Sequence, residues 1–411
     1  MTAPTQPLDT RVYRWQPSTR KVGIAGMILG GLAFWLALPP VATRSPAIPA
    51  AIGFFGAAAG IWAVSRGERR VGWSALLISV LGLASGVLAT RAATGNLELV
   101  VTWSALIAAM FRYATPLTFA AIGGMFSERS GVVNIGLEGM MLMGAFFGVW
   151  GAVKTGSWEL GIFIGMAAGA ALALVHAFFC INVRADQIVV GTAINFLALG
   201  ITGYAYIDIY GLAGTPDNVP AIPNVHLAFL QHVPPAYVGN FLNDSIGTMN
   251  LMIWLSFALV IVAHIIMFHT PIGLRIRSVG EHPRAADTVG ISVYRTRYLA
   301  VTTSGALAAL GGVYLSIGFV GGFSENLTAG RGFIALAALI FGNWRPFGAF
   351  GAALLFGFAS AFAPLLQNVD SWAQYGTLFQ ALPYLLTLIA VAGLIGRSIP
   401  PAAIGRPYEK Q

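Results

Sequence analysis

The chain has 411 residues, of which 57% are hydrophobic and only 9% are charged. Folded soluble domains carry about 25% charged residues, so this composition excludes an ordinary soluble protein, and its abundant apolar surface excludes a disordered one. The single cysteine, Cys180, excludes an internal disulfide framework and a cysteine-based zinc site, and the net charge of +8 is tested first as a signal of membrane orientation.

Apolar segments long enough to cross a bilayer recur along the chain. A hydrocarbon core requires about 20 apolar residues per helix. We predict an all-α integral membrane protein with twelve membrane helices, at residues 22–42, 46–65, 71–90, 98–126, 132–153, 158–182, 187–209, 249–269, 298–320, 329–342, 347–366 and 376–396. The first lacks a small-residue cleavage site and is expected to be retained. The tenth is short, which is typical of a half-helix or a re-entrant segment.

Basic residues predict the orientation of these helices, because Lys and Arg stay on the cytoplasmic side. With the N-terminus inside, only four of the 23 basic residues lie outside and one lies within a span. Those outside are Arg44, Arg91, Lys154 and Arg331, and the one within a span is Arg112. Both termini are therefore expected in the cytoplasm, and the positive net charge requires no nucleic-acid partner.

The longest outside segment, residues 210–248, contains no Lys or Arg but five prolines. The prolines are Pro216, Pro220, Pro223, Pro234 and Pro235. This composition predicts a loop, with a short interfacial helix around residues 228–232. Two interpretations stay open: a docking surface for an external protein and a simple connector.

A polar stretch, SERSGVVNIGLEGMMLM, begins at Ser127 and runs into a predicted span. Its polar and flexible character comes from Gly131, Asn134, Gly136 and Glu138. An ionisable residue inside a membrane costs roughly 2.5–3.5 kcal/mol, so it normally faces a cavity or a partner. The two glycines permit a break in the helix. These residues therefore lie beside a translocation pathway, or Glu138 pairs with Arg112 or caps a neighbouring helix.

The most basic internal loop, PIGLRIRSVGEHPRAADTVGISVYRTR from Pro271, carries helix start and stop signals. We predict two short helices, the first with His282 as N-cap, Pro283 at its first position and Gly290 as its left-handed end. Ser292 then caps a second helix that enters the next span. The predicted knob contains Glu281, His282, Pro283, Arg284, Ala285, Ala286, Asp287 and Gly290. Such a knob can receive force from a soluble partner; the alternative is an ordinary solvated loop.

Three segments resemble a known family: residues 112–148, 279–312 and 333–357. They are similar to permease subunits of the ATP-binding-cassette importers that are grouped with ribose, branched-chain amino acid and nucleoside permeases. The resemblance covers roughly residues 98–396, and it is strongest to the shorter permease of Bmp/Nup-type nucleoside systems. It implies a permease core over 98–396 and a cytoplasmic tail over 397–411. Residues 1–97, with three predicted helices, depart from the family pattern.

The resemblance also implies partners. Two membrane subunits, often different ones, form a dimer in the bacterial plasma membrane; ATPase subunits bind below, and a substrate-binding lipoprotein binds outside. The family's coupling helix falls on Glu281–Gly290. The sequence has no G-x-x-x-x-G-K-[ST] loop. We therefore expect a non-enzymatic subunit that binds no cofactor and no metal itself, with ATP used by partner subunits.

Two other function classes compete with this interpretation. A self-sufficient secondary transporter would use Glu138, His176, Asp208 and His264 as an ion relay, but these residues are few and scattered. A membrane enzyme has no supporting motif in the sequence.

The substrate is read only from the resemblance, which favours a nucleoside and leaves a simple sugar as the alternative. Four aromatic residues near the polar stretch can stack on a base or simply pack helices: Phe111, Tyr113, Phe119 and Phe126.

Overall fold

The computed structural model describes residues 18–37, 47–91, 103–234, 236–367, 381 and 398–410. The chain divides into two compact units, Met1–Leu99 and Val100–Gln411, and each is described by itself. Apart from residue 381, the last predicted span at 376–396 lies outside the described residues.

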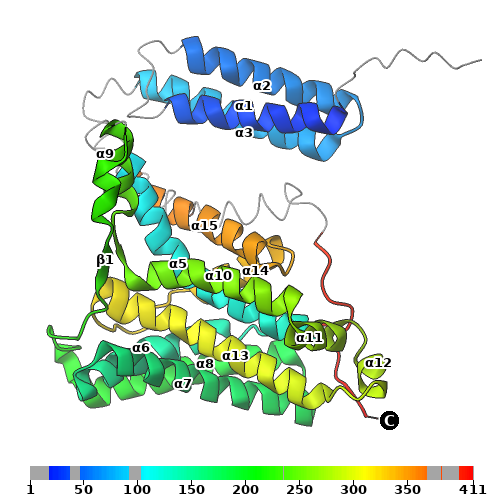
Figure 1. Cartoon of the computed structure of the whole chain (residues 1–411), viewed down its shortest axis with the longest axis vertical. Coiled ribbons are helices and arrows are strands. Elements are labelled where there is room, and N and C mark those ends of the chain that lie inside the picture. Colours follow the sequence, from blue (N-terminus) through cyan, green and yellow to red (C-terminus); the bar gives the residue numbers. More distant parts are fainter. Residues whose placement is uncertain are drawn as a thin grey trace, which may run out of the picture. The chain divides into compact units, whose positions relative to one another are not determined.

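Three helices form the first unit (Figure 1). They are α1 (Thr19–Ala37), α2 (Ala47–Ser65) and α3 (Arg69–Arg91). Glycines allow them to approach closely, because a Cβ at Gly30 of α1 would lie 2.7 Å from the backbone N of Ser79 on α3. Apolar side chains such as Ile28, Phe54 and Trp73 point outward and are 60% exposed or more. The unit therefore presents apolar surface of the kind that suits lipid.

The second unit is built mainly from long helices. They are α5 (Trp103–Arg129), α6 (Leu137–Thr155), α7 (Trp158–Ala177) continued by the π-helix η1 (Phe178–Val183), α8 (Gln187–Tyr210), α10 (Leu251–His269), α13 (Val293–Val313) continued by the π-helix η4 (Tyr314–Val320), and α15 (Pro346–Gln367). Shorter helices lie between them: η2 (Gly211–Ala213), η3 (Ala228–His232), α9 (Ala236–Ile246), α11 (Pro271–Glu281), α12 (Pro283–Thr288) and α14 (Arg331–Phe341).

Seven of the described helices are long and apolar enough to cross a membrane, so the chain is a multi-pass membrane protein. They are α2, α5, α7 with η1, α8, α10, α13 with η4, and α15. All seven coincide with predicted spans. The tenth predicted span, residues 329–342, contains only the short helix α14, which has 11 residues and is only ~16 Å long. That is about half of the hydrocarbon thickness.

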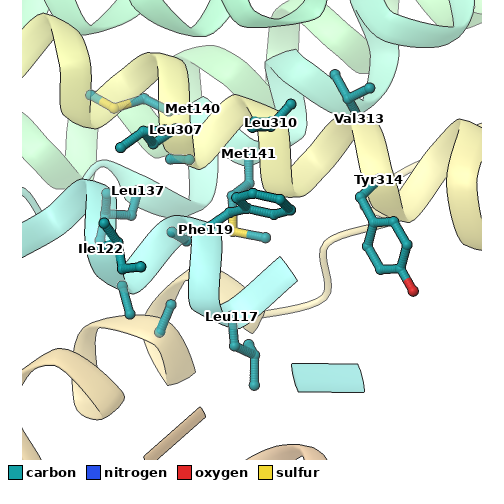
Figure 2. Close-up of a cluster of buried hydrophobic side chains, with 14 of the residues drawn as sticks. Leu117, Phe119, Ile122, Leu137, Met140, Met141, Leu307, Leu310, Val313 and Tyr314 are labelled. Carbon is teal, nitrogen blue, oxygen red and sulfur yellow. The ribbon is translucent and has the colours of Figure 1, made fainter. Parts of the chain in front are cut away.

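The core of the second unit lies where α13 packs against α5, α6 and α7 (Figure 1). Figure 2 shows side chains from three of these helices meeting around Phe119 and Met141. Those from α5 are Leu117, Phe119 and Ile122, those from α6 are Leu137, Met140 and Met141, and those from α13 are Leu307, Leu310 and Val313. Phe119 and Met141 are fully buried, so this packing fixes the helices that surround the candidate site.

The segment between α8 and α10 is more structured than the sequence predicts. The short helix near residues 228–232 is confirmed as η3. However, α9 follows it, and the three-residue strands β1 (Asn224–His226) and β2 (Thr248–Asn250) pair antiparallel, with Val225 opposite Met249. Strands this short leave no alternating pattern that sequence analysis can detect.

Candidate functional site

The polar stretch forms a break between two helices. α5 ends at Arg129 and α6 begins at Leu137, so residues 130–136, the α5–α6 break, are not helical. The predicted start of the second helix at residue 132 was wrong by five residues. Gly131 has a φ of +92°, which side chains with a Cβ rarely adopt. Gly136 has an ordinary φ of −72°, and its role is spatial, since a Cβ there would lie 3.0 Å from Ile194.

Side chains from α7 and α8 satisfy the backbone of the break. Gln187 accepts from the Val133 N–H at 2.7 Å, and His176 Nε2 lies 3.0 Å from the Val133 carbonyl. The Asn195 amide donates to the Ile135 carbonyl at 3.0 Å. Broken helices are tolerated at membrane depth only where protein or a wet cavity satisfies the backbone. His176 therefore helps to satisfy the backbone of the break.

Glu138 caps the N-terminus of the half-helix α14. Its carboxylate accepts from the Thr328 hydroxyl (2.6 Å) and from the backbone N–H groups of Gly330 (2.7 Å) and Gly332 (2.5 Å). The side chain is 8% exposed. A carboxylate is favoured at this end of a helix by the free N–H groups and by the helix dipole. Of the two structural alternatives, capping is therefore observed, whereas Arg112 makes no ion pair with Glu138.

The other end of α14 is held by the last residues of α5. The Trp344 indole donates to the buried Glu128 carboxylate at 2.5 Å. Arg129 donates from Nε to the Trp344 carbonyl at 3.0 Å and from Nη2 to the Asn343 carbonyl at 3.4 Å. Residues on the two sides of the break thus hold α14 at both ends. The sequence gives no local signal for these contacts, because Glu128 and Trp344 are 216 positions apart.

Asn134 links the break to α13. It is fully buried, and its Nδ2 donates to the Ser304 hydroxyl at 2.9 Å. Its Oδ1 has no partner within the described residues. The polar residues at positions 134 and 138 therefore contact different helices, α13 and α14, across a short span of chain.

Arg297 belongs to the same region, and sequence analysis missed it. The positive-inside count places it in a cytoplasmic loop, yet it is only 1% exposed in the first turns of α13. Its Nε donates to the Ser130 carbonyl, and its Nη1 donates to the Arg406 carbonyl, both at 3.2 Å. Carbonyl oxygens offset part of the cost of burying this cation. They also tie the break to the C-terminal segment.

The basic segment at residues 271–297, which we call the coupling segment because the resemblance implies a coupling helix within it, contains three helices, where the sequence predicts two. α12 matches the predicted turn, with Pro283 at its first position and Gly290 beyond its end at a φ of +84°. The side chains of His282 and Ser292 occupy N-cap positions but make no capping hydrogen bond. The missed helix is α11, which begins after Thr270, whose hydroxyl accepts from the Gly273 N–H at 3.3 Å. The Thr-Pro pair at 270–271 was its available signal.

One face of α12 is exposed, and the other packs against the rest of the second unit. Glu281, His282, Arg284 and Ala285 are exposed. Ala286, which the sequence places on a docking surface, is instead 3% exposed. It packs in a cluster with Val279, Val293 and Tyr408. Beside α12, a groove of about 400 Å³ between α11 and α13 is lined by Arg275 and Arg295 among apolar and hydroxyl side chains.

This architecture can be compared with that of known proteins. Residues 106–391 match the family described as the branched-chain amino acid transport system / permease component. The chain belongs to this permease family. The three helices of the first unit lie outside the matched range.

Several curated proteins are similar to this permease. It is 44% identical over 324 residues to the guanosine ABC transporter permease protein NupQ of Bacillus subtilis (strain 168), covering 76% of this chain and 99% of that one. It is 38% identical over 321 residues to the nucleoside ABC transporter permease protein NupC of Lactococcus lactis subsp. cremoris (strain MG1363), covering 76% of this chain and 99% of that one. A second Bacillus protein, the guanosine ABC transporter permease protein NupP, is 24% identical over 302 residues, or 69% of this chain and 82% of that one. No solved structure matches the chain.

The aromatic residues near the break pack within the permease. Phe119 and Phe126 are buried in the core. Phe111 meets Phe257 edge-on at 5.3 Å between ring centroids, and Tyr113 meets Phe319 at 5.5 Å. Helix packing therefore accounts for all four rings in this conformation. Across the described residues, no three His, Cys, Asp or Glu side chains are grouped in a way that would hold a metal ion.

Proposed function

We propose that this chain is a transmembrane subunit of an ATP-binding-cassette importer for nucleosides. The observation that carries the proposal is the 44% identity to a guanosine permease over 99% of that protein's length. The chain would form the translocation pathway, with both termini in the cytoplasm of a bacterium. Residues 98–396 would be the transport core, 1–97 an extension that packs at the lipid face, and 397–411 a cytoplasmic tail.

The partner subunits would be of three kinds. One Bacillus species has two guanosine permeases, which differ greatly in similarity to this chain, at 44% and 24% identity. This favours a pair of unlike permeases, of which this chain is one. Separate ATPase subunits would bind and hydrolyse ATP, so this chain would hold no cofactor. The segment between α8 and α10 contains a helix, α9, and two paired strands, β1 and β2. This regular structure favours its use as a docking surface for an external substrate-binding lipoprotein over its use as a plain connector.

The pathway in this proposal runs beside α14. Half-helices whose ends meet polar side chains are typical of transport sites. Here Gly131 and Gly136 shape the α5–α6 break, while Asn134 and Glu138 fix it to α13 and α14. A shift of the break would therefore shift the N-terminus of α14, which makes this group a gate for the substrate. The holding contacts are polar and few, so two arrangements can be close in free energy.

The ATPase would dock on the exposed face of α12, beside the groove that contains Arg275 and Arg295. Adjacent residues give a matched test, because Ala285 is exposed and Ala286 is buried. Ala285→Glu should leave the permease folded but release the ATPase or reduce coupled uptake by about tenfold or more. Ala286→Glu should lower the thermal stability of the isolated permease. Normal ATPase copurification and uptake in Ala285→Glu would refute docking at this face.

The function itself is tested by reconstitution. Vesicles holding this chain, its second permease, the ATPase and the binding lipoprotein should accumulate labelled guanosine on addition of ATP. Ribose and glucose should not compete with it. Vesicles holding this chain alone should neither hydrolyse ATP nor accumulate nucleoside. Uptake by the chain alone, driven by a proton gradient, would overturn the proposal and establish a secondary transporter.

A further inference from the structure

The C-terminal segment, residues 398–410, lies at the same end of the second unit as α11 and α12 (Figure 1). We call this segment the strap. Four of its backbone N–H groups donate to other parts of the chain: Ile399 to Asn343 Oδ1 (3.0 Å), Ala402 to Glu281 Oε2 (3.1 Å), Ala403 to the Gly280 carbonyl (2.9 Å) and Gly405 to the Gly131 carbonyl (3.1 Å). The strap thus touches, in turn, the α14–α15 turn, α11 and the α5–α6 break.

Two arginine side chains add to these contacts. The buried Arg297 donates both to Ser130 in the break and to Arg406 in the strap, so one guanidinium joins the two segments. Arg184, which follows η1, forms an ion pair with Glu409 at 2.6 Å. The ion pair is exposed and contributes little stability. The Arg297 contact to Ser130 is buried and the one to Arg406 is partly buried, so these two contacts stabilise the attachment more than the exposed ion pair does.

Tyr408 anchors the strap beneath α12. Its side chain is 6% exposed, and it packs with Val279 of α11, Ala286 of α12 and Val293 of α13. Burial of the ring, together with the negative charge of the nearby Asp287 of α12, raises the pKa of Tyr408. This cluster is separate from the main core. Tyr408 has its largest side chain, so the position of α12 depends on it more than on any other member.

α12 has little else to hold it. It contains six residues, fewer than two turns, and neither end carries a side-chain cap. A helix this short is not stable by itself in water. Its orientation is therefore set by the chain connections at His282 and Gly290 and by the cluster around Tyr408.

We propose that the strap positions α12 and ties any displacement of α12 to the α5–α6 break, with Tyr408 as the positioning residue. Only Arg406 and Pro407 separate Tyr408 from Gly405, which bonds to the break. An extended residue spans at most ~3.6 Å, so this connection has little slack. Movement of α12 must therefore pull on the break or release the Tyr408 ring. The inference rests on the proposed function, in which the ATPase moves α12.

The first test needs only the purified permease. Hydrogen exchange of backbone amides is compared between wild type and Tyr408→Ala, in residues 283–290 of the coupling segment and in residues 130–136 of the break. Both segments should exchange at least tenfold faster in Tyr408→Ala. Tyr408→Phe, which keeps the ring, should stay within about threefold of wild type, as should Lys410→Ala, an exposed control on the same strap. Tyr408→Leu replaces Tyr408→Ala if the latter does not fold.

The second test uses the reconstituted importer, where the ratio of ATP hydrolysed to nucleoside transported is measured. Tyr408→Ala should raise this ratio about tenfold, while Tyr408→Phe restores it. Faster exchange in α12 with an unchanged break would overturn the link, and unchanged exchange in both segments would overturn the positioning role. If wild-type vesicles transport no nucleoside, the proposed function fails, but the exchange experiment still decides the inference.

Discussion

Glu138→Gln should loosen the N-terminus of α14 without unfolding the permease. In wild type, three donors converge on one carboxylate, from Thr328, Gly330 and Gly332. The amide variant keeps one acceptor oxygen and presents an NH₂ group to at least one donor. The loss is one hydrogen bond to a charged group, about 1.5–3 kcal/mol, and one charge–dipole interaction, about 0.3–1 kcal/mol. The local cost is therefore roughly 2–4 kcal/mol, or about 30- to 1,000-fold in the opening equilibrium.

The expected effect is local because a neutral amide is also less costly to bury than a carboxylate. Hydrogen exchange of the amides at 330–334 should therefore rise by that factor, while the melting temperature of the permease in detergent falls only slightly. Uptake should fall more than the amount of inserted protein. Glu159→Gln is the matched control, since Glu159 also lies in the first turn of a helix but is exposed. Unchanged exchange at 330–334 would refute the capping role, and loss of inserted protein before loss of uptake would refute the gate.

Two further substitutions, each paired with a control substitution, test how the break and α14 are held. Gly131→Ala should destabilise the permease by about 1–3 kcal/mol in thermal unfolding, since a left-handed φ is strained and the new Cβ would lie 2.9 Å from Arg297 Nη2. Gly156→Ala, at a φ of +68° with open space around it, should cost no more than about 1 kcal/mol. Trp344→Phe should cost about 1.5–3 kcal/mol by removing the donor to Glu128. Trp254→Phe should be near neutral in the same assay, because that buried indole N–H has no partner in the described chain.

Hydropathy identifies the long helices well but misplaces the start of the helix that follows the break. Val132, Val133 and Ile135 are apolar, so a composition-based span begins at residue 132. What prevents helix there is the backbone of Gly131 together with side chains that bind the carbonyl and N–H groups of residue 133. Those side chains come from α7 and α8, and no local pattern reveals them. The two glycines indicated that a break was possible, but they did not give its length.

The polar residues of the candidate site were found because they are rare in an apolar chain. Glu138 and Asn134 are conspicuous inside a predicted span, where each polar group requires a partner. The identity of the partners was not predictable, since Thr328 and Ser304 lie 190 and 170 positions away. Arg297 was missed for the opposite reason. It sits in a basic segment, where one more arginine looks like part of a solvated loop.

In the coupling segment, local sequence signals predict the bounds of a helix but not which of its faces is buried. Pro283 and Gly290 predict the bounds of α12 because they act on their own backbone dihedrals. A six-residue helix does not complete two turns, so its sequence has no periodicity from which an inner face can be read. Small residues at 285 and 286 look equivalent in the sequence, and yet only one of them is buried. What separates them is Tyr408, which reaches α12 from the far end of the chain. The contact between Tyr408 and Ala286 therefore sets the orientation of α12, the helix to which we assign ATPase docking. We expect α12 to reorient only when this tertiary contact changes.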